Sequence, residues 1–67
     1  MTLMVNGERF DAEGDGFCVA ELLEALELSR ERVAVEVNRE LVRRSEFSET
    51  ALHEGDKVEV VRFVGGG

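Results

Sequence analysis

The chain is poor in the residues from which special sites are built. It has no proline, tryptophan or tyrosine, only one cysteine (Cys18) and only one histidine (His53). A single cysteine excludes an intramolecular disulfide framework and cannot complete a zinc site alone. No apolar run approaches the ~20 residues that a membrane-spanning helix needs. These shortages predict a protein with no disulfide scaffold, no membrane span and no metal site.

Positive charge is also scarce. The 67 residues contain eight Lys or Arg against fifteen Asp or Glu, a formal net charge of −7. This balance argues against binding nucleic acid or anionic membranes and favours basic protein partners. The opening MTLMVNGERF lacks the basic start and apolar stretch of a signal peptide, so we expect a cytoplasmic protein. So short a chain has little room for a deep catalytic cavity, which favours a carrier or binding role over an enzyme.

What is present is a regular order of strand and helix patterns. Asn6-Gly7 predicts a tight hairpin turn between strands at residues 1–5 and 8–11. Apolar residues at helical spacing, from Val19 to Leu26, predict an amphipathic helix that ends near residue 27 or 28.

Three more stretches have strand patterns: Val33–Val37, Glu40–Val42 and Lys57–Val64. Residues 43–54 between them are irregular, with Phe47 and Leu52 as expected core residues. One helix packed on one face of a mixed sheet of four to five strands satisfies two-layer packing at this length. We therefore predict an α+β fold.

Two motifs imitate ligand-binding loops and fail. The run Asp11-x-Glu13-x-Asp15-Gly16 resembles the start of a calcium loop, but its twelfth position is Leu22 instead of glutamate. Gly14-x-Gly16 resembles the opening of a dinucleotide fingerprint, but Val19 stands where the third glycine belongs. There is no Walker loop either. We therefore predict no cofactor-binding residues, so any ATP used with this protein must be bound by a partner.

Cys18 and His53 could in principle form a nucleophilic pair. No third group that would orient them is recognisable. A small apolar residue at a helix start and an exposed loop residue are the better interpretations, and we predict no enzymatic active site.

The glycines that follow the last strand, Gly65–Gly67, allow two interpretations. One is a frayed end. The other is functional, because residues without a Cβ can thread a narrow channel and present the carboxylate of Gly67 inside another protein's active site. We expect that carboxylate to be ionised at pH 7, which makes it a poor acyl electrophile. A partner that adenylates it would make the carbonyl carbon open to attack by a sulfur or nitrogen nucleophile. We accordingly divide the chain into a domain at 1–64 and a flexible tail at 65–67.

The last strand carries a second signal. Val58 and Val60 share the parity expected for the core, while Val61 and Phe63 fall on the opposite parity. Apolar side chains on the outer face beside the glycines would form a docking patch. A bulge or a second core layer would instead bury them. Both interpretations stay open at this point.

In four segments the sequence resembles the ThiS family, the sulfur carrier proteins of thiamine biosynthesis: MTLMVNGE, VAELLEAL, VAVEVNRELVRR and LHEGDKVEVVRFVGGG. The most specific features are, in order, Val37-Asn38, Val42-x-Arg44, Gly55-Asp56 and the terminal Gly66-Gly67. Cys18 departs from the pattern, since threonine is usual there, and Gly65 stands where members vary.

The resemblance implies a ubiquitin-like β-grasp fold, with the first and last strands parallel at the sheet centre. It also implies that a ThiF-like adenylyltransferase uses ATP and Mg²⁺ to adenylate the C-terminal glycine, matched by Gly67. Sulfur from the persulfide of a cysteine desulfurase system then replaces AMP and leaves a thiocarboxylate. A ThiG-like thiazole synthase accepts that sulfur, so the chain would be a co-substrate of its partners and no enzyme.

Three other functions remain as alternatives. The MoaD family, the small subunits of molybdopterin synthase, shares the fold and tail but is usually longer in the middle region. A ubiquitin-like protein modifier would attach Gly67 to lysines of target proteins. A regulatory β-grasp module would carry the glycines incidentally.

Overall fold

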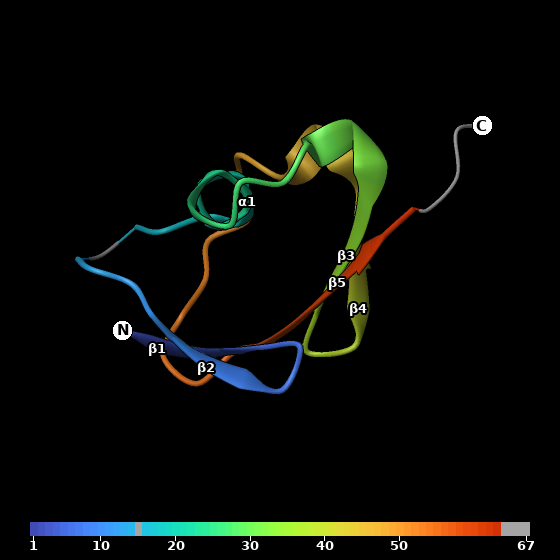
Figure 1. Cartoon of the computed structure of the whole chain (residues 1–67). Coiled ribbons are helices and arrows are strands. Elements are labelled where there is room, and N and C mark those ends of the chain that lie inside the picture. Colours follow the sequence, from blue (N-terminus) through green and yellow to red (C-terminus); the bar gives the residue numbers. More distant parts are fainter. Residues whose placement is uncertain (15, 64–67) are drawn as a thin grey trace.

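Five strands form one mixed sheet in a computed structural model that describes residues 1–14 and 16–63 (Figure 1). The strands are β1 (Thr2–Val5), β2 (Glu8–Asp11), β3 (Val33–Val37), β4 (Glu40–Val42) and β5 (Lys57–Arg62). Their order is β2-β1-β5-β3-β4, with β1 parallel to β5 and the other neighbours antiparallel. The prediction of a mixed α+β sheet with parallel first and last strands at its centre is confirmed.

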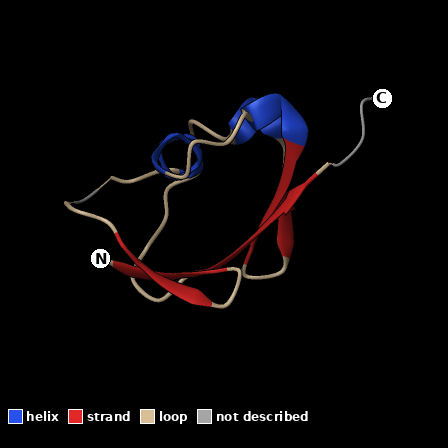
Figure 2. Ribbon diagram, in the orientation of Figure 1, coloured by secondary structure: helices blue, strands red, loops and turns tan. Residues whose placement is uncertain are grey.

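The helical elements lie together on one side of the sheet, which curves around them (Figure 2). They are the helix α1 (Val19–Ala25) and the 3₁₀ turns η1 (Arg30–Arg32) and η2 (Arg44–Glu46). Between this layer and the sheet lies the core: Leu3, Val5, Val19, Leu22, Leu23, Val33, Val35, Phe47, Leu52, Val58 and Val60. Phe47 and Leu52, the core residues expected from the irregular segment, are each 1% exposed.

Both hairpins turn on two residues with positive φ, as type I′ turns require. Asn6 and Gly7 have φ of 50° and 81°, and Asn38 and Arg39 have 52° and 72°. Short turns of this type fix the register of the strands that they join. The predicted bounds of β2, β3 and β4 are accordingly the observed ones.

The helix is shorter than predicted. It ends at Ala25, and Glu27 takes up a left-handed conformation with φ of 58°. The Leu28 N–H then donates to the Leu23 carbonyl at 2.9 Å, which closes the helix end. The expected end near residue 27 or 28 is wrong because glutamate, instead of the usual glycine, occupies the left-handed position.

The helix start is capped by a distant segment. The N–H groups of Val19 and Ala20 donate to the carbonyls of Thr50 and Phe47, each at 3.0 Å. These bonds satisfy two of the N–H groups that a helix leaves free at its start. No strong side-chain acceptor is therefore needed at Cys18, where threonine would be usual.

Candidate functional site

The site is organised by β5, the central strand that leads to the glycines. Asparagine side chains from the two hairpin turns hold it on opposite edges. Asn6 Oδ1 accepts from the Val60 N–H at 2.7 Å, and Asn6 Nδ2 donates to the Val60 carbonyl at 3.1 Å. Asn38 Oδ1 accepts from the Lys57 N–H at 3.0 Å. Beyond the end of β1, the Asn6 side chain therefore makes the hydrogen bonds to β5 that the backbone of a longer β1 would make.

Of the two interpretations left open for Val61 and Phe63, the outward direction is the observed one. Val58 and Val60 are buried, whereas Val61 is 59% exposed and Phe63 is 54% exposed. The alternatives that would have buried them, a bulge or a second core layer, are excluded by this exposure. We call Val61 and Phe63 the terminal patch. Their binding of a partner stays a prediction.

Leu41 is a third exposed apolar side chain that the sequence pattern did not single out. It is 70% exposed on β4, two strands away from β5. Between them, Glu36 of β3 faces Leu41 on one side and Glu59 of β5 on the other. Two carboxylates directly opposite each other disfavour the sheet. Their retention on an exposed face fits the expectation of basic partners.

Gly65, Gly66 and Gly67, the predicted tail and reactive end, lie outside the described residues, as does Val64. The structure describes the strand that precedes them. This strand ends at Arg62. Phe63 is the last residue that the structure describes, and its N–H donates to the Arg32 carbonyl at 2.9 Å.

Residues of three motifs that resemble the ThiS family hold the segments next to β5 in place. Asp56 accepts from Asn38 Nδ2 at 3.0 Å and from the His53 N–H at 2.9 Å. Arg44 Nε donates to the Arg30 carbonyl at 2.9 Å, which ties η2 to η1. These motif residues therefore hold the loops at the two ends of β5.

The remaining candidate residues have local contacts. Cys18 is half-buried, and His53 is exposed with its Nδ1 at 3.9 Å from Asp56 Oδ2. No hydrogen bond joins Cys18 to His53 in the part of the chain that the structure describes. Nor do His, Cys, Asp and Glu side chains there gather in a group of three that could hold a metal ion.

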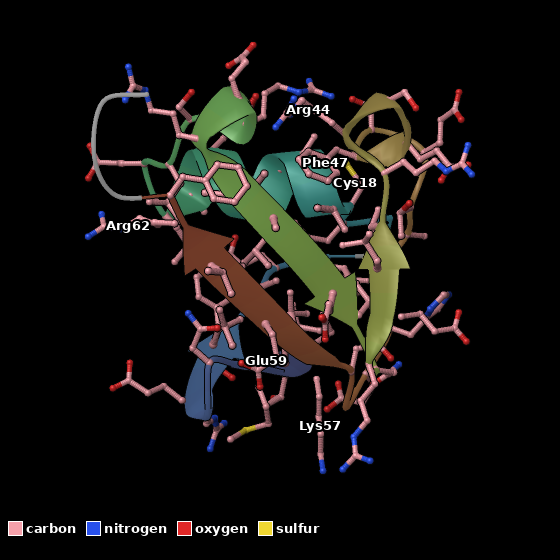
Figure 3. The ribbon with its side chains drawn as sticks, turned by 90° about the vertical axis from the view of Figure 1, so that its right-hand side faces the viewer. Cys18, Arg44, Phe47, Lys57, Glu59 and Arg62 are labelled. Atoms are coloured by element: carbon pink, nitrogen blue, oxygen red, sulfur yellow. The ribbon has the colours of Figure 1, made fainter. Side chains whose placement is uncertain are left out.

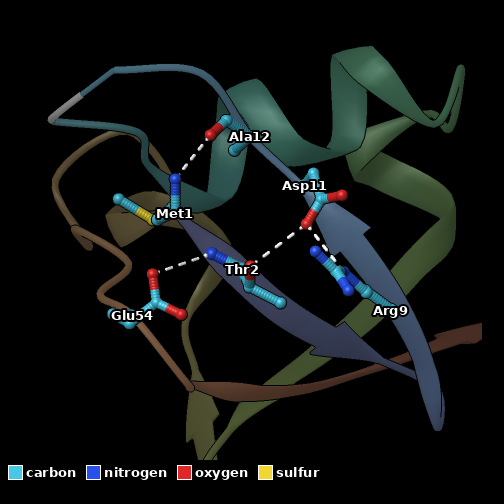
Figure 4. A network of polar contacts seen from close by, with 6 residues as sticks. All are labelled: Met1, Thr2, Arg9, Asp11, Ala12 and Glu54. Carbon is cyan, nitrogen blue, oxygen red and sulfur yellow. Dashed lines mark hydrogen bonds and ion pairs between the residues drawn. The ribbon is translucent and has the colours of Figure 1, made fainter.

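Asp11, the first carboxylate of the calcium-like run, is held by its own hairpin (Figure 4). Its Oδ1 accepts from Arg9 Nε at 3.0 Å and from Thr2 Oγ1 at 3.1 Å. These bonds, the one from Arg9 first, lower the pKa of Asp11 below its ordinary value of 3.8. Thr2 also donates its N–H to Glu54, and the Met1 nitrogen donates to the Ala12 carbonyl. These hydrogen bonds tie the start of β1 to the end of β2 and to Glu54.

A helix grasped by a mixed sheet whose central strand ends in an exposed apolar patch defines a ubiquitin-like β-grasp protein. Residues 3–67 match the model of the ThiS family. The chain belongs to this family, the sulfur carrier proteins of thiamine biosynthesis. The family match favours this role over the MoaD-like alternative.

Individual relatives agree. The crystal structure of the thiamine biosynthesis protein ThiS from Geobacter metallireducens is 42% identical, with a TM-score of 0.82 and full coverage of both chains. The sulfur carrier protein ThiS of Bacillus subtilis is 34% identical over 65 residues, which cover 97% of this chain and 98% of that protein. A thiazole synthase from Paramagnetospirillum magneticum is 40% identical over all 67 residues. The chain spans only 20% of that protein's length, and the same share of a thiazole synthase from Magnetococcus marinus.

Within the described residues, no helix has both the length and the apolar character needed to cross a membrane.

Proposed function

We propose that this chain carries sulfur on the terminal carboxylate of Gly67 and itself catalyses no step. One carboxylate oxygen attacks the α-phosphorus of ATP, pyrophosphate leaves, and an acyl adenylate forms. The outer sulfur of a persulfide donor then attacks the carbonyl carbon and AMP leaves, which gives an acyl disulfide. A second thiol of the donor system attacks the donor sulfur of this S–S bond, forms a disulfide with the donor cysteine, and releases the thiocarboxylate. The ATP and Mg²⁺ belong to a ThiF-like adenylyltransferase that works with the chain in the cytoplasm.

The observation that carries this proposal is the extent of the family match, which runs from residue 3 through Gly66 and Gly67. The geometry adds support, since β5 is fixed at the centre of the sheet and leads directly toward these glycines. Glycines present no Cβ to the walls of a narrow channel. The proposal requires a free carboxylate on Gly67 in the cell.

A thiazole synthase is the proposed acceptor of the sulfur. In two relatives named thiazole synthase, a segment similar to this whole chain forms part of one longer polypeptide. Joining two sequences in one chain raises the local concentration of each for the other. That arrangement supports a working contact between this domain and a ThiG-like enzyme.

Mass spectrometry of the protein from its own cells tests the proposal. Trypsin cuts after Arg62 and releases the peptide of residues 63–67, which contains neither methionine nor cysteine. Replacement of one oxygen by sulfur in this peptide therefore cannot be confused with oxidation of Met1, Met4 or Cys18. If the peptide retains both oxygens while thiamine is being made, or if the chain continues beyond Gly67, the proposal fails.

The terminal patch is the proposed docking surface for the adenylyltransferase. Apolar side chains that a partner desolvates contribute more to binding than charges at the rim. We expect Phe63→Ala to raise the KM for the carrier roughly tenfold or more, with kcat nearly unchanged. Leu41→Ala is the matched control, because Leu41 is also exposed but lies two strands away. Normal kinetics for Phe63→Ala, with melting unchanged, would place the docking surface elsewhere.

A further inference from the structure

Arginine is distributed unevenly over the chain. Five of the eight basic residues lie in or next to η1, η2 and the end of β5: Arg30, Arg32, Arg43, Arg44 and Arg62. Together, the segments 27–33, 43–47 and 61–63 hold these five arginines and three glutamates, a formal charge of +2. The rest of the chain holds three bases and twelve acids, a charge of −9. We call the three basic segments the arginine end.

Hydrogen bonds join these segments into one surface. The Phe63 N–H bonds the Arg32 carbonyl, which connects the end of β5 to η1. Arg44 Nε and Nη2 donate to the carbonyls of Arg30 and Glu31 at 2.9 and 3.3 Å, which connects η2 to η1. Figure 3 shows Arg44 and Arg62 toward the end of the sheet where β5 finishes, far from Lys57 at its start.

The arginines of this surface differ in what they contact. The Arg44 side chain donates hydrogen bonds to backbone carbonyls. The Arg30 guanidinium lies over the Phe47 ring, with its carbon 5.7 Å from the ring centre. Arg32 and Arg62 are exposed, and their side chains make no hydrogen bond or ion pair with any residue that the structure describes. Their two guanidinium groups therefore remain available to a partner.

Arg32 and Arg62 border the same groove. It has a volume of about 260 Å³, and Glu27, Leu28 and Phe63 also line it, so two guanidinium groups face a single carboxylate there. An apolar lining with two guanidinium groups suits a peptide segment that carries carboxylates, because guanidinium binds carboxylate through two parallel hydrogen bonds. The groove also touches Phe63, the last described residue before the glycines.

We propose that the arginine end binds an acidic segment of the adenylyltransferase, whose carboxylates pair with Arg32 and Arg62. This inference rests on the proposed function, and it adds the sign of the charge on the partner at this place. Total charge alone predicts the opposite, since a chain of −7 should prefer basic surfaces. A carrier with a basic end and an acidic remainder can dock in only one orientation, because the reverse orientation sets like charges against each other.

Charge reversal separates the local effect from the effect of total charge. Arg32→Glu and Arg62→Glu each change the net charge from −7 to −9, and so does the control Arg39→Glu in the distant β3–β4 turn. Adenylation is followed by release of pyrophosphate at several carrier concentrations. We expect the KM for the carrier to rise ~5–10-fold for Arg32→Glu and Arg62→Glu at low salt, with kcat unchanged, and the difference to shrink at high salt.

The control variant should keep the wild-type KM or lower it, because its added negative charge lies far from the arginine end. Melting curves show whether each variant is folded. If the Arg62→Glu variant is unfolded, the KM of the Arg32→Glu variant alone tests the inference. If the wild type releases pyrophosphate and the two variants react like the Arg39→Glu control, the inference is overturned while the proposed function stands. If the wild type itself releases none, the proposed function fails and the inference falls with it.

Discussion

The side chain of Asn6 should contribute a large share of the stability of this small domain. It makes two hydrogen bonds to the backbone of Val60, at 2.7 and 3.1 Å, in a partly buried position. Each such bond contributes roughly 1 kcal/mol net. Asn6→Gly keeps a residue that tolerates positive φ but removes both bonds, so we expect a loss of about 2 kcal/mol.

That loss is large compared with the free energy of unfolding expected for the whole chain, which is roughly 3–10 kcal/mol. For a domain of this size it corresponds to a fall in Tm of roughly 8–16 °C. Arg39→Gly is the matched control. It also places glycine at a turn position with positive φ, and Arg39 makes no side-chain hydrogen bond among the described residues. Arg39→Gly should be neutral or stabilising.

Thermal melting gives the global effect, and amide hydrogen exchange gives its location. In the Asn6→Gly variant the Val60 amide should lose more protection than the amides of β3, because its acceptor is gone. The reasoning is refuted if Tm falls by less than ~3 °C relative to Arg39→Gly and the Val60 amide stays protected.

Three further outcomes follow from local contacts. Glu27→Gly should stabilise the chain by ~1 kcal/mol in urea denaturation, because glycine relieves the left-handed strain at the helix end; a loss of stability would show that the glutamate side chain is needed there. Cys18→Thr should change stability by less than ~0.5 kcal/mol, because loop carbonyls already accept the first helix amides, and a gain well above this would contradict that account. Thr2→Val should raise the pKa of Asp11 toward 3.8 in an NMR titration. In the wild type the lowered pKa stabilises the fold above pH 3.8, and this contribution is lost as the pH falls through the folded-state value.

Local patterns were sufficient to predict the five strands, although β5 ends at Arg62 and does not continue through Phe63 as predicted. The two-residue turns at Asn6 and Asn38 set the strand bounds, because each turn permits one register. Alternation placed Val61 and Phe63 on the parity opposite to the core, but only their exposure in the folded chain excludes a bulge or a second core layer that would bury them. Leu41 was not predicted, because a strand of three residues is too short to establish a parity.

Contacts between distant segments could not be predicted in this way. The carbonyl of Thr50 caps the helix start at Val19, 31 residues away in sequence, and no local signal marks that pairing. Arg44 bonds the carbonyl of Arg30 across 14 residues. The groove at the arginine end depends on this packing, because arginines scattered along the sequence carry no sign that they meet on one surface.

The bond from the Phe63 N–H to the Arg32 carbonyl also sets a limit on reach. It is the last described point at which the backbone is held to the rest of the domain, here to η1. Gly67 is the fourth residue after Phe63, and four fully extended residues span at most about 14 Å. An enzyme that reacts with the Gly67 carboxylate therefore needs its reactive centre within that distance of the end of β5. Under the proposed function, a deeper centre would be out of reach, and the channel of the adenylyltransferase would have to open close to Phe63.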